Sequence, residues 1–253
     1  MNIRFDNKVV VVTGSSSGIG KATAIEFAKA GADVVIHYNS NVRGAEDVAS
    51  EIEETGQRSV VIRGDLSQKV HVDNLVKETM RAFGSIDILV NNAGTLVERK
   101  PIETMDEQLW DRVMEVNLKS VFLCSNAVIP IMKENGFGRI INVTSIAARN
   151  GGGPGAGHYS SAKAGVLTFT KSLAKELAGT GILVNCVSPG VISTPYHDAY
   201  STAESRKMFA DNTPLKREGT PEEVACPILF LASEYASFIL GETLEINGGM
   251  LMD

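Results

Sequence analysis

The fold class is decided by the segment KVVVVTGSSSGIG, residues 8–20. Its valine run predicts a strand buried on both faces, and the apolar periodicity of residues 18–30 predicts a helix directly after it. The spacing Gly-x3-Gly-x-Gly between them allows a sharp turn and lets an anion approach the free amides of the helix N-terminus. A turn with a glycine helix cap would also explain these glycines, but the position between a first strand and a helix favours a nucleotide site.

The same alternation of strand and helix continues along the whole chain. Short β-branched runs predict strands at 8–13, 32–38, 58–64, 87–92, 138–145, 182–188 and 243–247. Helical periodicity separates them at 18–30, 43–55, 68–83, 106–135, 159–178 and 221–233. Because parallel neighbours need crossover connections, this order predicts an α/β fold with a mainly parallel sheet and helices on both faces. No linker or repeat interrupts the order, so we expect one domain over residues 1–253.

Composition excludes several classes of protein. The 253 residues are 43% hydrophobic and 21% charged, as in ordinary globular proteins. The net charge of −6 argues against a nucleic-acid partner, which normally requires a basic surface. The opening MNIRFDNK lacks the apolar core of a signal peptide, and the apolar runs are too short to cross a bilayer, so we expect a soluble, cytoplasmic protein without a membrane partner. The cysteines and histidines show no metal-ligand spacing, so no metal site is predicted.

Two further segments follow strands of the predicted sheet. Asp65-Leu66 comes after the third strand, and the segment 91–94, Asn-Asn-Ala-Gly, comes after the fourth. The carboxyl ends of parallel strands share the edge of the sheet at which α/β proteins bind ligands. An aspartate after a strand is also a common turn or helix-cap residue, so neither segment decides the matter by itself.

Tyr159 and Lys163 are the candidates for acid–base chemistry. They are four residues apart in a predicted helix and therefore share one face of it. A neighbouring ammonium lowers the pKa of a phenol, which suits a proton donor or acceptor. Ser145 ends the fifth strand with a hydroxyl that can hold a substrate oxygen. Asn117 is a poor helix former inside a long predicted helix, so it requires a local or functional reason.

Together these motifs resemble the single-domain short-chain dehydrogenase/reductase family. The motifs, in the order and at close to the spacings typical of that family, are TGSSSGIG (13–20), NNAG (91–94), Asn117, Ser145, YSSAK (159–163), SPG (188–190) and INGG (246–249). The resemblance covers essentially the whole chain. It implies a Rossmann-type, doubly wound sheet of seven strands and NAD(P)-linked interconversion of a carbonyl and an alcohol. It also implies a small-molecule carbonyl substrate and a homotetramer formed through region 106–135 and the C-terminal helix and strand.

The resemblance assigns roles to individual residues. Tyr159 is implied as the general acid/base, Ser145 as the hydrogen-bond donor to the reacting oxygen, and Lys163 as the group that lowers the Tyr159 pKa and holds the nicotinamide ribose. Asn117 would hold a water that relays protons to Lys163, and Asp65 would meet the adenine. The residues implied in cofactor binding are Gly14, Ser16, Ser17, Gly18, Ile19, Gly20, Tyr38, Asn39, Ser40, Asp65, Leu66, Asn91, Ala93, Gly94, Tyr159, Lys163, Pro189, Gly190, Ile192 and Thr194. A non-catalytic dinucleotide sensor is the competing interpretation, but such proteins typically lack the acid–base side chains that are present here.

The end of the second predicted strand favours NADPH as cofactor. NAD-selective sites of this fold usually place an acidic side chain there, whereas this chain reads HYNSN at residues 37–41. Amide and hydroxyl donors at Asn39, Ser40 and Asn41 suit a 2′-phosphate, and Arg43 follows closely. No arginine occupies the strand end itself, so use of NADH as well remains an open alternative.

Two loops bear on the substrate, residues 91–101 and 151–157. They resemble the family branch that reduces the 2-keto-3-deoxy uronate released from alginate, whereas 3-oxoacyl-carrier-protein reductase is the common member of the family. The candidates to meet a carboxylate are Arg99, Lys100, Arg149, His158 and His197. We therefore expect a polar keto acid or keto sugar, with an acyl thioester as the alternative. Ser145 and Tyr159 are fourteen residues apart, one more than is common in the family, and we expect the extra loop residue to bulge while both ends stay fixed.

Overall fold

The computed structural model describes residues 2–252, apart from the side chains of residues 197–199. Across this range, seven strands form one sheet in the order β3-β2-β1-β4-β5-β6-β7, and every neighbouring pair is parallel. The strands are β1 (Val9–Val12), β2 (Asp33–Tyr38), β3 (Ser59–Arg63), β4 (Ile88–Asn91), β5 (Gly138–Val143), β6 (Ile182–Pro189) and β7 (Thr243–Ile246). The predicted seven-stranded, doubly wound parallel sheet is confirmed, and each strand lies within two residues of its expected bounds.

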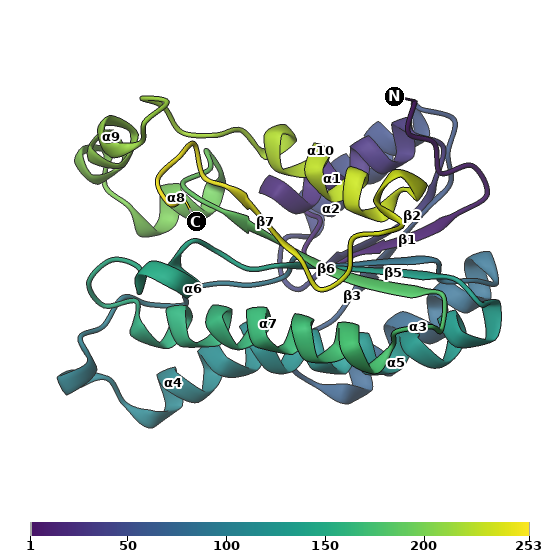
Figure 1. Ribbon diagram of the computed structural model, residues 1–253, viewed down its shortest axis with the longest axis horizontal. Helices are drawn as coiled ribbons and strands as arrows, with labels where there is room; N and C mark the ends of the chain where they lie inside the picture. Colours follow the sequence, from purple (N-terminus) through teal and green to yellow (C-terminus); the bar gives the residue numbers. More distant parts are fainter. Residues whose placement is uncertain (1, 253) are drawn as a thin grey trace.

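Helices cover both faces of the sheet (Figure 1). One side carries α1, α2 and α10, and the opposite side carries α3, α4, α5 and α7. Their bounds are α1 (Gly18–Lys29), α2 (Val42–Glu53), α3 (Lys69–Phe83), α4 (Glu107–Met114), α5 (Ser120–Asn135), α7 (Gly157–Glu176) and α10 (Pro221–Ala232). Within the described residues, no helix is long and apolar enough to cross a bilayer.

The valines of β1 contribute to two separate cores. Successive side chains of a strand point to opposite faces of its sheet, so alternate residues meet different helices. Val10 and Val12 pack in the core that contains Phe27 of α1, whereas Val9 and Val11 pack in the core on the side of α3, α5 and α7. This two-sided burial explains why the strand reads as an unbroken apolar run.

The edge of the sheet at the carboxyl ends of the strands carries the shorter helices. The order of the strands reverses between β1 and β4, and the loops that follow these two strands diverge and leave a crevice, which is the usual ligand site of such sheets. Three additional helices, α6 (Ala147–Asn150), α8 (Pro195–Tyr200) and α9 (Ala203–Asn212), lie at this end of the sheet (Figure 1). There are also two single 3₁₀ turns, η1 (Ile102–Thr104) and η3 (Glu234–Ala236).

The helix expected over residues 106–135 is interrupted. After α4 the chain makes a π-helical turn, η2 (Glu115–Lys119), before α5 begins. Asn117 lies in this turn, fully buried, and its amide donates to the carbonyls of Val113 at 2.9 Å and Thr95 at 2.7 Å. Such turns are frequent at functional sites, so the poor helix former at this position does have a local reason.

Candidate active site

A cavity of about 670 Å³ lies at the carboxyl edge of the sheet. Ser145 and most of the residues expected to bind a cofactor line it: Gly14, Ser16, Ser17, Gly18, Ile19, Tyr38, Asn39, Ser40, Asp65, Leu66, Ala93, Gly94, Tyr159, Lys163, Pro189, Gly190, Ile192 and Thr194. Segments far apart in the sequence therefore meet around one space. Gly20, Asn91 and Asn117 are not among its lining residues.

The glycine-rich turn is shaped for close contact with an anion. Gly14 and Gly18 have φ values of 65° and 55°, in the left-handed region that favours glycine. Ser17 caps α1 without a side-chain hydrogen bond to the helix, so the first-turn amides are left for another acceptor. Gly20 acts through packing, because a Cβ added there would lie 2.4 Å from the carbonyl oxygen of Gly14. These features fit a cofactor pyrophosphate at the N-terminus of α1.

Ser145 and Tyr159 meet in spite of the longer loop between them. Both side chains line the cavity, so the two ends of the loop reach the same site. The Oγ of Ser145 accepts a hydrogen bond from the amide of Ala147 at 3.1 Å, which leaves its O–H free to point toward a substrate. Tyr196 from α8 packs beside Tyr159, with ring centroids 6.1 Å apart.

Lys163 lies one helical turn after Tyr159 and is buried. Its Nζ donates to the carbonyl of Val143 at 2.8 Å and lies 5.8 Å from the centroid of the Tyr159 ring. Burial lowers the pKa of Lys163 to about 8, and burial raises the pKa of Tyr159, with hydrogen bonds from Ser145 and Tyr196 opposing the rise. The role of Lys163 in lowering the Tyr159 pKa stays a prediction, because its ammonium here points to a backbone carbonyl.

Known proteins share this arrangement over the full chain. A family profile described as "Enoyl-(Acyl carrier protein) reductase" matches residues 14–251. A 3-oxoacyl-[acyl-carrier-protein] reductase of Synechocystis sp. is 44% identical over 250 residues, 97% of either chain. The chain belongs to the short-chain dehydrogenase/reductase family. Its members with named activities establish this protein as an NAD(P)-dependent oxidoreductase.

Other relatives differ in the substrates that their names state. A (2S)-[(R)-hydroxy(phenyl)methyl]succinyl-CoA dehydrogenase subunit of Thauera aromatica is 44% identical over 247 residues, 96% of each chain. A solved 7α-hydroxysteroid dehydrogenase, complexed with NADH, superposes with a TM-score of 0.93 at 34% identity and covers 100% of this chain and 97% of its own. An NADH-dependent reductase, A1-R′, responsible for alginate metabolism superposes with a TM-score of 0.90 at 32% identity over 98% of both chains. The family is therefore shown, whereas its substrate range is wide.

The two asparagines of the NNAG motif (91–94) contact different parts of the structure. Asn91 is buried, and its amide donates to Asn142 at 2.9 Å and to Ser125 at 3.2 Å, so it ties β4 to the neighbouring elements instead of lining the cavity. Asn92, which we did not single out, lines the cavity and donates to the carbonyl of Thr13 at 2.9 Å. A pattern of consecutive asparagines cannot tell which of the two faces the cofactor, because that depends on where the strand ends.

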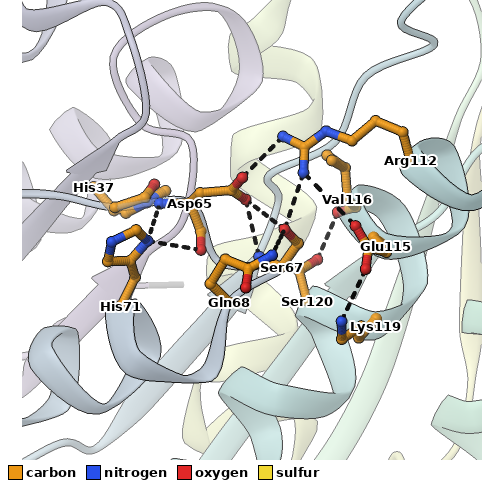
Figure 2. A network of polar contacts seen from close by, with 11 residues as sticks. His37, Asp65, Ser67, Gln68, His71, Arg112, Glu115, Val116, Lys119 and Ser120 are labelled. Atoms are coloured by element: carbon orange, nitrogen blue, oxygen red, sulfur yellow. Dashed lines mark hydrogen bonds and ion pairs between the residues drawn. The ribbon is translucent and has the colours of Figure 1, made fainter. Parts of the chain in front are cut away.

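Asp65 belongs to a polar network that reaches α4 (Figure 2). Its carboxylate accepts from the amide and hydroxyl of Ser67 at 3.1 and 2.7 Å and pairs with Arg112 at 3.0 Å. Burial acts to raise the pKa of Asp65, but the hydrogen bonds from Ser67 and the charge of Arg112 lower it overall. Asp65 therefore stays an ionised acceptor at the cavity wall, and Arg112 is a lining residue that its sequence context did not reveal.

Gly94 and Lys163 line one end of the cavity, and Asn117 packs against them from outside its lining. A Cβ added to Gly94 would lie 2.6 Å from Oδ1 of Asn117 and 3.1 Å from Nζ of Lys163. Both polar groups thus face the same small space in front of Gly94, which is where a proton relay to Lys163 would have to run. Any side chain at residue 94 would fill it.

The residues expected to bind a substrate carboxylate differ in whether they line the cavity and whether a carboxylate already pairs with them. Arg99 lines the cavity, whereas Lys100 pairs with Asp106 at 3.0 Å and Arg149 with Glu245 at 3.1 Å. His158 is fully buried, and its Nε2 donates to the carbonyl of Glu98 at 3.0 Å. His158 therefore does not face the cavity, and the side chain of His197 lies outside the described residues.

The arrangement suits reduction of a carbonyl by proton and hydride addition. A reduced nicotinamide cofactor, with its pyrophosphate held by the glycine-rich turn, would supply the hydride. Ser145 and Tyr159 both line the cavity with hydroxyl-bearing side chains, so one can hold a carbonyl oxygen by a hydrogen bond while the other donates a proton. Lys163 and Asn117 both lie against Gly94, next to this part of the cavity.

Proposed function

We propose that this protein reduces a small polar keto acid or keto sugar, such as the alginate-derived 4-deoxy-5-ketouronate, with NADPH as the preferred cofactor. The observation that carries the proposal is the polar wall beside Tyr159, which includes Thr95, Arg99, Asn150 and Tyr196. A hydroxylated substrate finds hydrogen-bond partners there, whereas an acyl chain would leave these groups without partners.

The comparisons support two substrate classes. The NADH-dependent reductase responsible for alginate metabolism covers 98% of the chain, and its name agrees with a substrate derived from alginate. Several 3-oxoacyl-[acyl-carrier-protein] reductases, at 40–44% identity, favour an acyl thioester, which is the second candidate. Two apolar side chains in the cavity wall, Phe209 and Met250, also suit that candidate.

NADPH preference is supported by charge near the end of β2. Tyr38, Asn39 and Ser40 line the cavity, no acidic residue occurs in the segment 37–41, and Nε of Arg63 from β3 donates to the carbonyl of Asn39 at 3.3 Å. A cation at this place favours a 2′-phosphate. Arg63 lies beside Asn39 only because β2 pairs with β3, so the sequence alone did not reveal it. Comparing kcat/KM for NADPH and NADH tests the preference, and about tenfold in favour of NADH would overturn it.

A homotetramer is also part of the proposal. Exposed apolar side chains lie on α5 and after α10, with Phe122 48% and Phe238 103% exposed. Such residues on two separate surfaces suit two kinds of subunit contact. Light scattering at micromolar concentration tests this, and a monomer would contradict it.

The substrate is tested by one assay of NADPH oxidation. The 4-deoxy-5-ketouronate, simple keto sugars and acetoacetyl thioesters are compared side by side by kcat/KM. We expect the ketouronate to be the best substrate. Thioester reduction about tenfold more efficient than that of every polar keto compound would reject the proposal in favour of the second candidate.

A further inference from the structure

Arg99 brings a positive charge to the cavity beside the catalytic tyrosine. Its Nε donates to the carbonyl of Tyr200 at 3.1 Å and its Nη1 to that of Pro154 at 3.2 Å. Two other cations line the cavity, but Arg112 pairs with Asp65 and Lys163 donates to Val143. Among the described residues, no carboxylate lies within ion-pair distance of Arg99. The acceptors of its two hydrogen bonds are neutral carbonyls, so its positive charge is not neutralised.

The peptide groups on both sides of Arg99 are fixed. The carbonyl of Glu98 accepts from the buried His158, and the amide of Lys100 donates to the carbonyl of Gly155 at 3.0 Å. Gly155 has φ +73°, and a Cβ there would lie 2.9 Å from the Lys100 amide nitrogen. The glycine-rich loop therefore approaches as closely as it does because it carries no side chain at this point.

The chain before Arg99 is strained. Val97 has φ 65°, in the left-handed region that is rare for a β-branched residue. The conformation persists because Leu96 is fully buried and the amide of Val97 donates to Oγ1 of Thr95 at 3.2 Å. Asn117 holds Thr95 by hydrogen bonds to both its amide and its carbonyl. The strained turn is thus anchored to the catalytic centre, and strain maintained in this way is typical of functional positions.

The charge of Arg99 reaches the groups around the reacting oxygen. It acts to lower the pKa of Tyr196, opposing the rise that burial causes. Tyr196 in turn packs beside Tyr159, with ring centroids 6.1 Å apart. A negative group of a substrate held between Arg99 and Tyr159 would therefore lie only a few bonds from the reacting carbonyl.

We propose that Arg99 is the residue that recognises an acidic substrate, by binding a carboxylate close to the carbonyl that Ser145 and Tyr159 hold. This inference rests on the proposed function and names the part of the substrate that the site selects. A guanidinium has five N–H groups, and the two carbonyls occupy only some of them, so a carboxylate can still be bound. Lys100 cannot take this role, because Asp106 neutralises it.

The test compares the ketouronate with its uncharged methyl ester. Both are measured as substrates of the wild type, Arg99→Met, Arg99→Lys and the control Lys100→Met. We expect Arg99→Met to raise KM for the acid by about 10- to 100-fold and to leave the ester nearly unchanged. Arg99→Lys should recover part of the affinity for the acid, and Lys100→Met should behave as the wild type does.

A purely structural role gives a different result. Tyr200→Phe removes the hydrogen bond of 2.9 Å between Tyr200 and Thr95 and loosens α8 without removing a charge, so it should affect acid and ester alike. If Arg99→Met also weakened acid and ester equally, the inference would be overturned.

If the wild type reduces only thioesters, the proposed function fails but Arg99 can still be tested. The acid and the ester are then compared as competitive inhibitors of acetoacetyl thioester reduction. Selective loss of inhibition by the acid in Arg99→Met supports the inference, and equal inhibition constants for the acid in wild type and variant refute it.

Discussion

Gly20→Ala is the sharpest test of how the glycine-rich turn is built. The added Cβ would lie 2.4 Å from the carbonyl oxygen of Gly14 and 2.5 Å from Nδ2 of Asn92. Ordinary contacts are near 3.5 Å, so the turn or helix α1 must move by about 1 Å. Overpacking costs about 1–3 kcal/mol, and the better helix propensity of alanine offsets up to about 1 kcal/mol of it. We therefore expect unfolding free energy to fall by roughly 0–2 kcal/mol and the cofactor Kd to rise by about tenfold or more.

The assay is NADPH fluorescence titration, with urea unfolding of the cofactor-free protein. Gly165→Ala is the matched control, since it is also a helical glycine whose Cβ would meet only the flexible end of Leu118, at 2.7 Å. It should leave cofactor binding unchanged. A Gly20→Ala variant that binds NADPH as tightly as the wild type would refute the reasoning.

Two further predictions concern pH. Burial lowers the pKa of His37 below its usual 6.5, so the unfolded chain takes up a proton first and stability falls from neutral to mildly acidic pH. Nδ1 of His37 accepts from the Gly14 amide at 3.0 Å. In His37→Gln, whose side chain does not titrate, the free energy of unfolding in urea should fall less toward acidic pH than in the wild type. An identical pH dependence of the two proteins would contradict this prediction. Burial lowers the pKa of Lys163 to about 8, so the ammonium is lost above that pH and kcat/KM should decline there, whereas a profile that stays level would count against its charge in catalysis.

Much of the fold was predictable because buried parallel strands leave an unmistakable pattern. The β-branched runs are apolar on both faces, and the helices between them carry regular apolar periodicity. The exceptions have physical reasons. The π-helical turn at Glu115–Lys119 keeps the apolar stripe continuous, so only Asn117 indicated it. Helix α9 has no buried residue among those described, so it produces no periodicity to detect.

The residues that line the cavity could be predicted from the sequence, whereas their partners could not. Tyr159 and Lys163 lie four residues apart on one helix, and their spacing became informative only together with the other ordered motifs. Arg63 beside Asn39 and Arg112 beside Asp65 are pairings between separate elements, which exist only once the sheet and helices assemble. The cations of the substrate loops looked equivalent in sequence, and only their carboxylate partners in the structure separate Arg99 from the others.

The central claim is that Tyr159 donates the proton to the substrate oxygen, and the kcat of Tyr159→Phe measures this most directly. The variant keeps the ring and loses only the hydroxyl, on the side chain that lines the cavity together with Ser145 and Tyr196. We predict that kcat falls by about 10²- to 10⁴-fold while the Kd for NADPH changes little. A variant that retains most of the wild-type kcat would contradict the account.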